Sequence, residues 1–268
     1  MASAADVAVL DLEDACPAAE RPAARLAVRD LIARPRDGLI YVRVNGAASG
    51  LLRADLEAVV GEGLDGVVLA KAERAADIAE AEQIIGMIEP RHGLPEGRIE
   101  IVPLVEGALG LVNARSIAGA SRRVRRLAFG SVDFALDVGM HPGPDEIELA
   151  PHRAALVLAS RVERLEPPID GVWLATGDDE GLARTARRAR AEGFQGKLCI
   201  HPGQIEAVAA AFVPTPVQID RARRIVQAFA AAAANGAAAI KVDGDLVDYP
   251  VVRQAERLLA SVAGAENP

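Results

Sequence analysis

The sequence is poor in cysteine, lysine and aromatic residues, and each shortage excludes a class of protein. Its two cysteines, Cys16 and Cys199, cannot form a metal cluster by themselves. Each lies in or beside a predicted buried strand, so we interpret both as reduced core thiols. The formal net charge is 30 − 38 = −8, and no basic run is interleaved with aromatic residues. Nucleic acid is therefore not expected as a partner.

Long apolar runs are also missing. No apolar stretch approaches the roughly 20 residues that a membrane-spanning helix needs. The N-terminus shows no charged segment followed by an apolar one, which a secretory leader would have. We therefore expect a cytoplasmic protein without a membrane partner.

The chain does contain a regular alternation of short apolar runs and amphipathic stretches, which indicates repeated β-α units around a parallel sheet. Seven strands are predicted, one short of a closed (β/α)8 barrel. A doubly wound open sheet is the alternative, but the first strand ends in acidic residues and not in a glycine-rich phosphate motif. The predicted strands are 6–12, 39–44, 66–71, 100–105, 126–130, 171–176 and 197–201. The predicted helices are 23–33, 51–61, 74–88, 108–118, 146–165 and 180–192, with a helical tail from 204.

Two acidic residues stand at the carboxyl ends of neighbouring predicted strands, the end at which barrel enzymes place their active sites. Glu106 follows the apolar run 99–105, and Asp133 follows the next strand. A carboxylate at the end of a buried strand is costly unless it is paired or bound to a metal. Together the two could supply part of an octahedral Mg²⁺ site. The alternative is that each caps the helix that follows it.

Arg43 lies within a β-branched run, where its charge needs an anionic partner. That partner is either a structural carboxylate, Asp14 or Glu106, or an oxygen of a substrate. Asp11, at the end of the first strand, is interpreted as part of the N-cap region of the next helix.

The residues alone leave two possible roles each for Lys71 and His201. Lys71 either forms a surface ion pair with Glu73 or contacts a ligand. His201 is either a structural histidine at a tight turn or a proton carrier.

Six motifs, in order along the chain, resemble those of one family. They are Asp11-Leu-Glu-Asp-Ala15, Tyr41-Val-Arg-Val-Asn45, Val105-Glu-Gly-Ala-Leu-Gly110, Phe129-Gly-Ser-Val-Asp133, Gly196-Lys-Leu-Cys-Ile-His-Pro-Gly-Gln204 and Val242-Asp-Gly-Asp-Leu-Val-Asp248. Together they resemble the citrate lyase beta-subunit family, which includes malyl-CoA, citramalyl-CoA and citryl-CoA lyases. The resemblance implies a (β/α)8 TIM barrel that binds Mg²⁺, with Mn²⁺ as a possible substitute, and assembles as a homotrimer or hexamer.

The resemblance also assigns roles to residues. Glu106 and Asp133 fall on the two metal ligands of the family, and Arg43 falls on the arginine that binds the carbonyl and thioester oxygens of the substrate. Asp248 matches a C-terminal aspartate that acts as acid and base in the active site of a neighbouring subunit. From the residues alone, Asp248 is the N-cap of the helix that follows.

Five further residues are carried over with auxiliary roles. Glu13 and Asp14 match an acidic pair near the metal, which holds metal-bound water. Arg21, Arg25 and Lys71 lie where family members place basic groups that meet the phosphates of CoA.

The chain departs from the family pattern in several places. The usual first strand and first helix are absent, so we expect an incomplete barrel over 1–212. A C-terminal helical extension over 213–268 is expected to contribute to the active site of a neighbouring subunit. Residue 107 is glycine where threonine is usual, and residue 70 is alanine where proline is common.

The resemblance predicts a Mg²⁺-dependent carbon–carbon lyase. Its substrate would be a short dicarboxylic or tricarboxylic hydroxyacyl-CoA thioester, and its products a 2-oxo acid and an acyl-CoA. A class II aldolase of 4-hydroxy-2-oxo acids without CoA is an alternative, but such enzymes use an early histidine and the first one here is His92. Hydrolysis of the thioester is a further possible reaction. A third alternative is that the chain is a weakly active or non-catalytic subunit of a lyase complex.

Overall fold

The computed structural model describes residues 5–265 and divides into two compact units, Met1–Ala209 and Ala210–Pro268. The division lies close to the boundary expected at residue 212. No helix within the described residues is long and apolar enough to cross a membrane.

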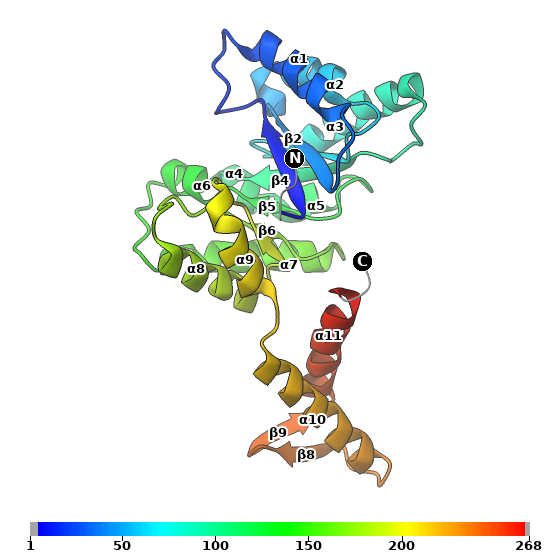
Figure 1. Ribbon diagram of the computed structural model, residues 1–268, viewed down its shortest axis with the longest axis vertical. Coiled ribbons are helices and arrows are strands. Elements are labelled where there is room, and N and C mark those ends of the chain that lie inside the picture. Colours follow the sequence, from blue (N-terminus) through cyan, green and yellow to red (C-terminus); the bar gives the residue numbers. More distant parts are fainter. Residues whose placement is uncertain (1–4, 266–268) are drawn as a thin grey trace. The chain divides into compact units, whose positions relative to one another are not determined.

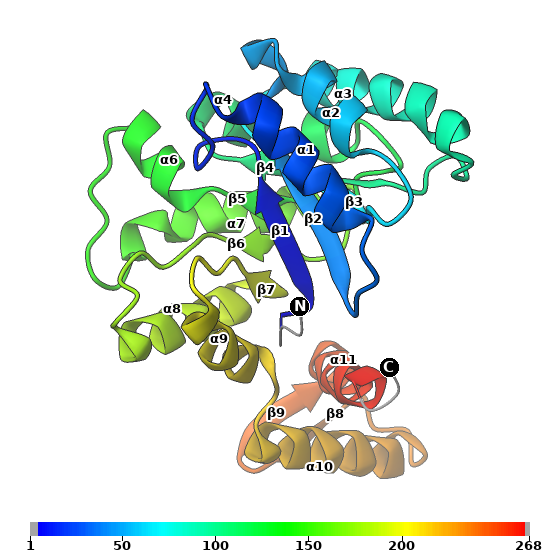
Figure 2. The same ribbon diagram turned by 45° about the horizontal axis from the view of Figure 1, so that its top comes forward.

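The first unit is built on a curled sheet of seven parallel strands, paired in the order in which they occur along the chain. Figure 2 shows the sheet curling into part of a barrel, with helices on its outer face. No pairing joins β1 to β7 within the described residues, so the barrel is open. The predicted fold class is confirmed. The strands are β1 (Val7–Asp11), β2 (Leu39–Val44), β3 (Gly66–Leu69), β4 (Glu100–Val105), β5 (Ala128–Phe129), β6 (Ile169–Asp170) and β7 (Gly196–Lys197).

The central strands form because their sequences are apolar on both faces. All four residues of β3 and all six of β4 are buried, as expected for a parallel strand covered on both sides. One face of the sheet carries Tyr41, Val68, Val102, Leu104 and Ala128, which pack together inside the curl. Burial of each large aliphatic side chain stabilises the fold by about 1.5–3 kcal/mol.

The sixth strand was predicted wrongly at 171–176, because the observed β6 ends with a charged residue. Asp170 is fully buried and is neutralised by Arg153 at 2.8 Å and by Lys197 at 2.6 Å. Such pairing makes a buried aspartate tolerable within a strand, and an apolar pattern cannot reveal it. β7, with Lys197, likewise begins earlier and ends sooner than the predicted 197–201.

Most helices of the first unit fall close to their predicted positions, but the helix over Ser131–Asp137 is not among the predicted ranges. The predicted helix 108–118 is broken into two at Asn113, whose Nδ2 donates to the backbone oxygen of Glu73 at 2.9 Å. The helices are α1 (Arg21–Ile32), α2 (Leu52–Val59), α3 (Ala75–Ile88), α4 (Ala108–Val112), α5 (Ala114–Ala118), α6 (Ser131–Asp137), α7 (Ala150–Val162) and α8 (Asp179–Glu192). Short 3-10 turns occupy Ala47–Ser49, Glu89–His92, Ile147–Leu149 and Pro202–Gln204, and α9 (Ile205–Phe212) leads into the second unit.

The second unit contains α10 (Pro216–Ala233), a hairpin of β8 (Ala239–Val242) and β9 (Asp245–Asp248), and α11 (Tyr249–Ala265). The second unit is thus mainly helical, as expected for the C-terminal extension, and also contains a two-stranded hairpin that was not predicted. Asp243 and Gly244, with φ of 53° and 90°, form the two-residue turn of the hairpin, a sequence typical of such turns. The helices α10 and α11 pack against each other and against the hairpin (Figure 1), around Ile225, Phe229 and Val247.

A buried ion pair ties the start of β4 to the loop before β5. Arg123 donates two hydrogen bonds of 2.6 Å to the two carboxylate oxygens of Glu89, and both side chains are almost fully buried. Glu89 also accepts the backbone N–H groups of Gly97 and Ile99. Each carboxylate oxygen thus has a backbone donor as well, but the negative charge of Glu89 is neutralised by Arg123.

We expect Arg123→Ala to lower the free energy of unfolding by about 3–5 kcal/mol, because it leaves a buried carboxylate without a counter-charge. Urea denaturation followed by circular dichroism measures the change. The matched control is Arg115→Ala, which removes an exposed arginine paired with Glu163 at 2.9 Å and should cost about 0–1 kcal/mol. Equal losses in the two variants would contradict this account.

Candidate functional site

The two acidic residues predicted to bind a metal lie at the carboxyl ends of adjacent strands. Glu106 follows β4 directly, and Asp133 is in the first turn of α6, just after β5. The strands pair in parallel with Val105 opposite Phe129, so their ends meet. Gly130 makes this approach possible, because a Cβ added to it would lie 2.3 Å from Cβ of Glu106.

Glu106 is held in place by backbone and is nearly buried. Its Oε1 accepts the backbone N–H of Lys71 at 2.7 Å, and its exposed fraction is 6%. Burial raises the pKa of Glu106 to about 7, with a further upward contribution from the charges of Asp133 and Glu13. The alternative that Glu106 caps α4 was wrong, since the N-cap of that helix is Gly107. The carboxylate is thus bonded to the backbone of Lys71 and does not cap a helix.

Lys71 contacts the site through both its backbone and its side chain. Its φ is +49°, in the left-handed region that few non-glycine residues adopt. This turn directs its N–H at Glu106, while its Nζ lies 2.5 Å from Oε1 of Glu13. The bond to Glu13 raises the pKa of Lys71. The predicted surface pair with Glu73 was wrong, because the αL turn carries the ammonium group toward β1.

Arg43 pairs chiefly with Asp11, a residue that the sequence analysis had placed in a helix N-cap region. Asp11 stands opposite Arg43 in the β1–β2 register and accepts from its Nε at 2.8 Å and its Nη2 at 2.5 Å. The Nη1 atom lies 3.2 Å from Glu13 and 3.8 Å from Asp14. The interpretation of Asp11 as part of a helix cap was wrong. A parallel register of β1 on β2 was the signal that could have found this pair.

Of the two α1 arginines predicted to meet CoA, Arg25 already has an internal partner. Nε of Arg25 donates to Asp55 at 2.7 Å, and the same buried carboxylate accepts from the backbone and side chain of Asn45. Arg21 is partly buried, and within the described residues its Nε has no hydrogen-bond partner. Arg21 is therefore the better placed of the two to meet an anion.

Asp248 and His201 each accept a hydrogen bond from a nearby backbone N–H group. Asp248 ends β9 in the second unit, and its Oδ1 accepts the N–H of Val251 at 3.4 Å, as in the helix-cap reading. His201 accepts the N–H of Gly203 on its Nδ1 at 3.1 Å, as expected for a histidine at a tight turn.

The acid pair fits a hard divalent cation only in part. Within residues 5–265, no three His, Cys, Asp or Glu side chains gather closely enough to hold a metal by themselves. Two carboxylates with water and substrate oxygens suit Mg²⁺, which commonly keeps several waters. Besides burial, the negative charge of Asp133 raises the pKa of Glu106, so the two acids repel each other. A cation between them would remove this repulsion.

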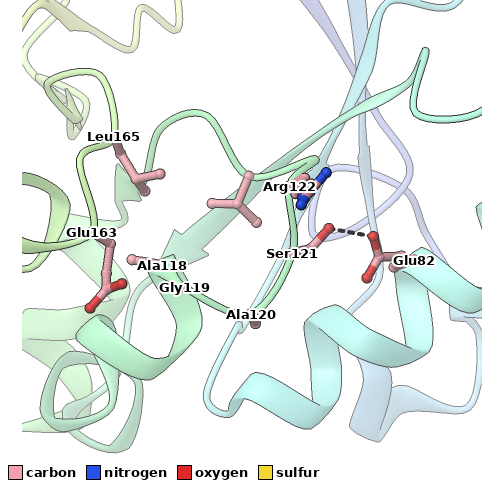
Figure 3. A pocket seen from close by; sticks show the side chains of 9 residues that line it. Glu82, Ala118, Gly119, Ala120, Ser121, Arg122, Glu163 and Leu165 are labelled. Carbon is pink, nitrogen blue, oxygen red and sulfur yellow. Dashed lines mark hydrogen bonds between the residues drawn. The ribbon is translucent and has the colours of Figure 1, made fainter.

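A hollow lies on the first unit at the amino-terminal ends of the strands, opposite the acid pair. It is formed by the loop 118–124, which leads into β5, together with Glu82 on one side and Glu163 and Leu165 on the other (Figure 3). Ser121 donates to Glu82 at 2.7 Å there. Barrel enzymes carry out their chemistry at the carboxyl ends, so the acid pair remains the candidate site.

The family model described as HpcH/HpaI aldolase/citrate lyase matches residues 1–202. The chain belongs to this family. It is 35% identical over 257 residues to the citrate lyase subunit beta of Leuconostoc mesenteroides subsp. cremoris, covering 95% of this chain and 85% of that protein. It is also 33% identical to the (3S)-malyl-CoA thioesterase of Cereibacter sphaeroides, over 96% of this chain and 86% of that protein.

Solved structures give the same assignment. The chain resembles the protein CitE of Mycobacterium tuberculosis in complex with magnesium, acetoacetate and coenzyme A. The TM-score is 0.77 at 32% identity, and the match covers 97% of this chain and 90% of that one. The resemblance seen in the six motifs is confirmed. The chain is therefore a member of a carbon–carbon lyase family.

Gly130→Ala tests the packing that brings the acid pair together. The added Cβ would lie 2.3 Å from Cβ and 2.6 Å from Oε2 of Glu106. We expect the free energy of unfolding to fall by about 1–3 kcal/mol, as for other overpacked sites. In a crystal structure of the variant, Glu106 should leave the N–H of Lys71.

The control is Gly177→Ala, at a glycine with nothing within 4 Å of an added Cβ. Its free energy of unfolding should change by no more than about 0.5 kcal/mol. An unchanged Glu106 position in Gly130→Ala would refute the packing argument.

Proposed function

We propose that the chain is a Mg²⁺-dependent carbon–carbon lyase acting on a short dicarboxylic or tricarboxylic hydroxyacyl-CoA thioester, such as malyl-, citramalyl- or citryl-CoA. The products would be a 2-oxo acid and an acyl-CoA. The observation that carries the proposal is that buried Glu106 and half-buried Asp133 stand at the carboxyl ends of two paired strands, where the charges of Asp133 and Arg43 both act on Glu106. Relatives that bind magnesium and coenzyme A support it.

Glu106 and Asp133 would hold the cation. When bound, Mg²⁺ supplies Lewis-acid polarisation of the carbonyl oxygen of the 2-oxo acid. The two carboxylates fix where that carbonyl sits, and Lys71 keeps Glu106 in place through its backbone N–H. Glu13, whose charge acts on Glu106, and Asp14 would orient water in the same site.

Arg43 would stabilise the negative charge that develops on the thioester oxygen when the carbon–carbon bond breaks. A guanidinium has five N–H donors, and Asp11 engages only those on Nε and Nη2. The pairing with Asp11 therefore orients the group and leaves Nη1 for an oxyanion. Glu13, at 3.2 Å, is the group that a substrate oxygen would have to displace there.

Asp248 would act as acid and base for the acyl carbon. In the cleavage direction it would give a proton to the carbon of the enolate, and in condensation it would remove a proton from the acyl-CoA methyl group. Its cap bond to Val251 uses Oδ1, so Oδ2 is left for this work. We propose that a second copy of the chain supplies this residue in a homotrimer or hexamer.

Arg21, Arg25 and Lys71 would meet the phosphates of CoA. Arg21 is the strongest of the three candidates, because Arg25 and Lys71 are each paired with a carboxylate while Nε of Arg21 has no hydrogen-bond partner within the described residues. Arg25 and Lys71 would have to share their carboxylate partners with the ligand.

Hydrolysis of the thioester is the second candidate function, favoured by the likeness to a (3S)-malyl-CoA thioesterase. The two reactions differ in their products. Cleavage of malyl-CoA releases glyoxylate and leaves CoA acylated, whereas hydrolysis releases malate and a free CoA thiol. Activity on a 4-hydroxy-2-oxo acid without CoA would indicate the aldolase reading, and inactivity on all substrates would indicate a non-catalytic subunit.

We expect the purified chain to cleave at least one of malyl-, citramalyl- and citryl-CoA with Mg²⁺, and to lose this activity with EDTA. Arg43→Ala should lower kcat by about 10²–10³, the usual effect of removing an oxyanion donor. Glu106→Gln and Asp133→Asn should abolish turnover while far-UV circular dichroism stays unchanged. Product analysis for oxo acid and for free thiol measures both reactions.

The matched control is Arg53→Ala, which removes an exposed arginine paired with Glu57 on α2. Its kcat should equal that of the unmodified chain. A Glu106→Gln variant that retains full Mg²⁺-dependent turnover would contradict the assignment of the metal site.

A further inference from the structure

Helix α4 begins two residues after Glu106, and no side chain of its own N-cap stabilises its start. The N-cap is Gly107, which has no side-chain oxygen to offer. The first N–H of the helix, that of Ala108, instead donates to Oδ2 of Asp137 at 2.7 Å. The carboxylate of Asp137, which belongs to another helix, therefore caps the start of α4.

Asp137 also lies on the segment that carries the other acid of the site. It ends α6, one helical turn after Asp133 in the same helix. The bond from Ala108 to Asp137 therefore joins the segment that contains Glu106 to the segment that contains Asp133. Each of its two ends lies close in sequence to one of the acids.

The room for this bond exists because residue 107 is glycine. A Cβ at this position would lie 3.3 Å from Oδ2 of Asp137, closer than an ordinary van der Waals contact. Gly107 has φ of −150° and ψ of 162°, an extended conformation that serine or threonine also adopts at an N-cap. A threonine here would cap α4 with its own hydroxyl. In this chain, the carboxylate of Asp137 occupies the space next to Gly107.

We propose that Asp137 is a positioning residue that sets the distance between Glu106 and Asp133, in place of a cap at residue 107. The proposal rests on the proposed function, in which these two acids hold a divalent cation. Asp137 acts only through the backbone at Ala108. Its removal should therefore weaken cation binding without removing a ligand.

The test is binding of Mn²⁺ to the full chain, measured by isothermal titration calorimetry and by the electron paramagnetic resonance signal of free Mn²⁺. Asp137→Ala should weaken binding by at least about tenfold, the usual effect of losing a group that supports a metal ligand. Asp137→Asn should stay within about threefold of the unmodified chain, because its amide oxygen still accepts the N–H of Ala108.

The decisive variant is the double substitution Asp137→Ala with Gly107→Thr. A threonine at the N-cap replaces the lost carboxylate and should bring Mn²⁺ affinity back to within about threefold of the unmodified chain. The control is Asp178→Ala, which removes a cap of the same kind from α8, where Oδ1 of Asp178 accepts the N–H of Gly181 at 2.9 Å. Its Mn²⁺ affinity should not change.

The outcomes separate the two proposals. Unchanged affinity in Asp137→Ala overturns the role of Asp137, provided that the unmodified chain binds Mn²⁺ and Glu106→Gln does not. A tenfold loss that neither Asp137→Asn nor Gly107→Thr corrects also overturns it. An unmodified chain that binds no Mn²⁺ overturns the metal site itself, and the role of Asp137 with it.

Discussion

The burial of one carboxylate, that of Glu106 at the end of β4, is the constraint on which the rest of the site depends. A buried carboxylate needs either a proton, a hydrogen-bond donor or a positive charge. The chain provides one backbone N–H from Lys71 and then adds a second acid, Asp133, beside it. This arrangement stabilises neither acid by itself. It becomes favourable when a cation is held between them.

The surrounding residues tolerate this repulsion because they fix the backbone. Gly130 permits Glu106 to lie against the next strand, and the left-handed turn at Lys71 supplies the N–H that Glu106 accepts. Rigid support of this kind is what separates a functional pair of acids from two exposed helix caps. It also explains why both segments bearing the acids are short and glycine-rich.

Opposite charges pair at the ends of the first three strands. Arg43 pairs with Asp11 and Glu13, and Lys71 pairs with Glu13. Each of the four residues therefore has a partner of opposite charge. Ion pairs between oriented, partly buried groups hold their geometry better than pairs of exposed side chains. Arg43 in particular is aligned by two bonds to Asp11 and offers its remaining nitrogen to the site. The site is thus arranged before any substrate binds.

The sequence predicted those parts of the structure that depend on hydrophobic periodicity. The parallel strands, their order and the acids at their ends follow from apolar runs such as 99–105. Two features escaped prediction because they depend on contacts between distant residues: the pairs of Asp170 with Arg153 and Lys197 define β6, and the Arg43–Asp11 pair depends on strand register. The hairpin of the second unit was missed although its turn at Asp243 and Gly244 has a local sequence signal.

The most direct test of the central claim is a crystal structure of the chain grown with Mn²⁺, with anomalous diffraction measured at the manganese edge. The account predicts one strong peak bound by the carboxylates of both Glu106 and Asp133. A strong peak bound by neither of them, in protein whose thioester cleavage depends on Mn²⁺, would contradict it.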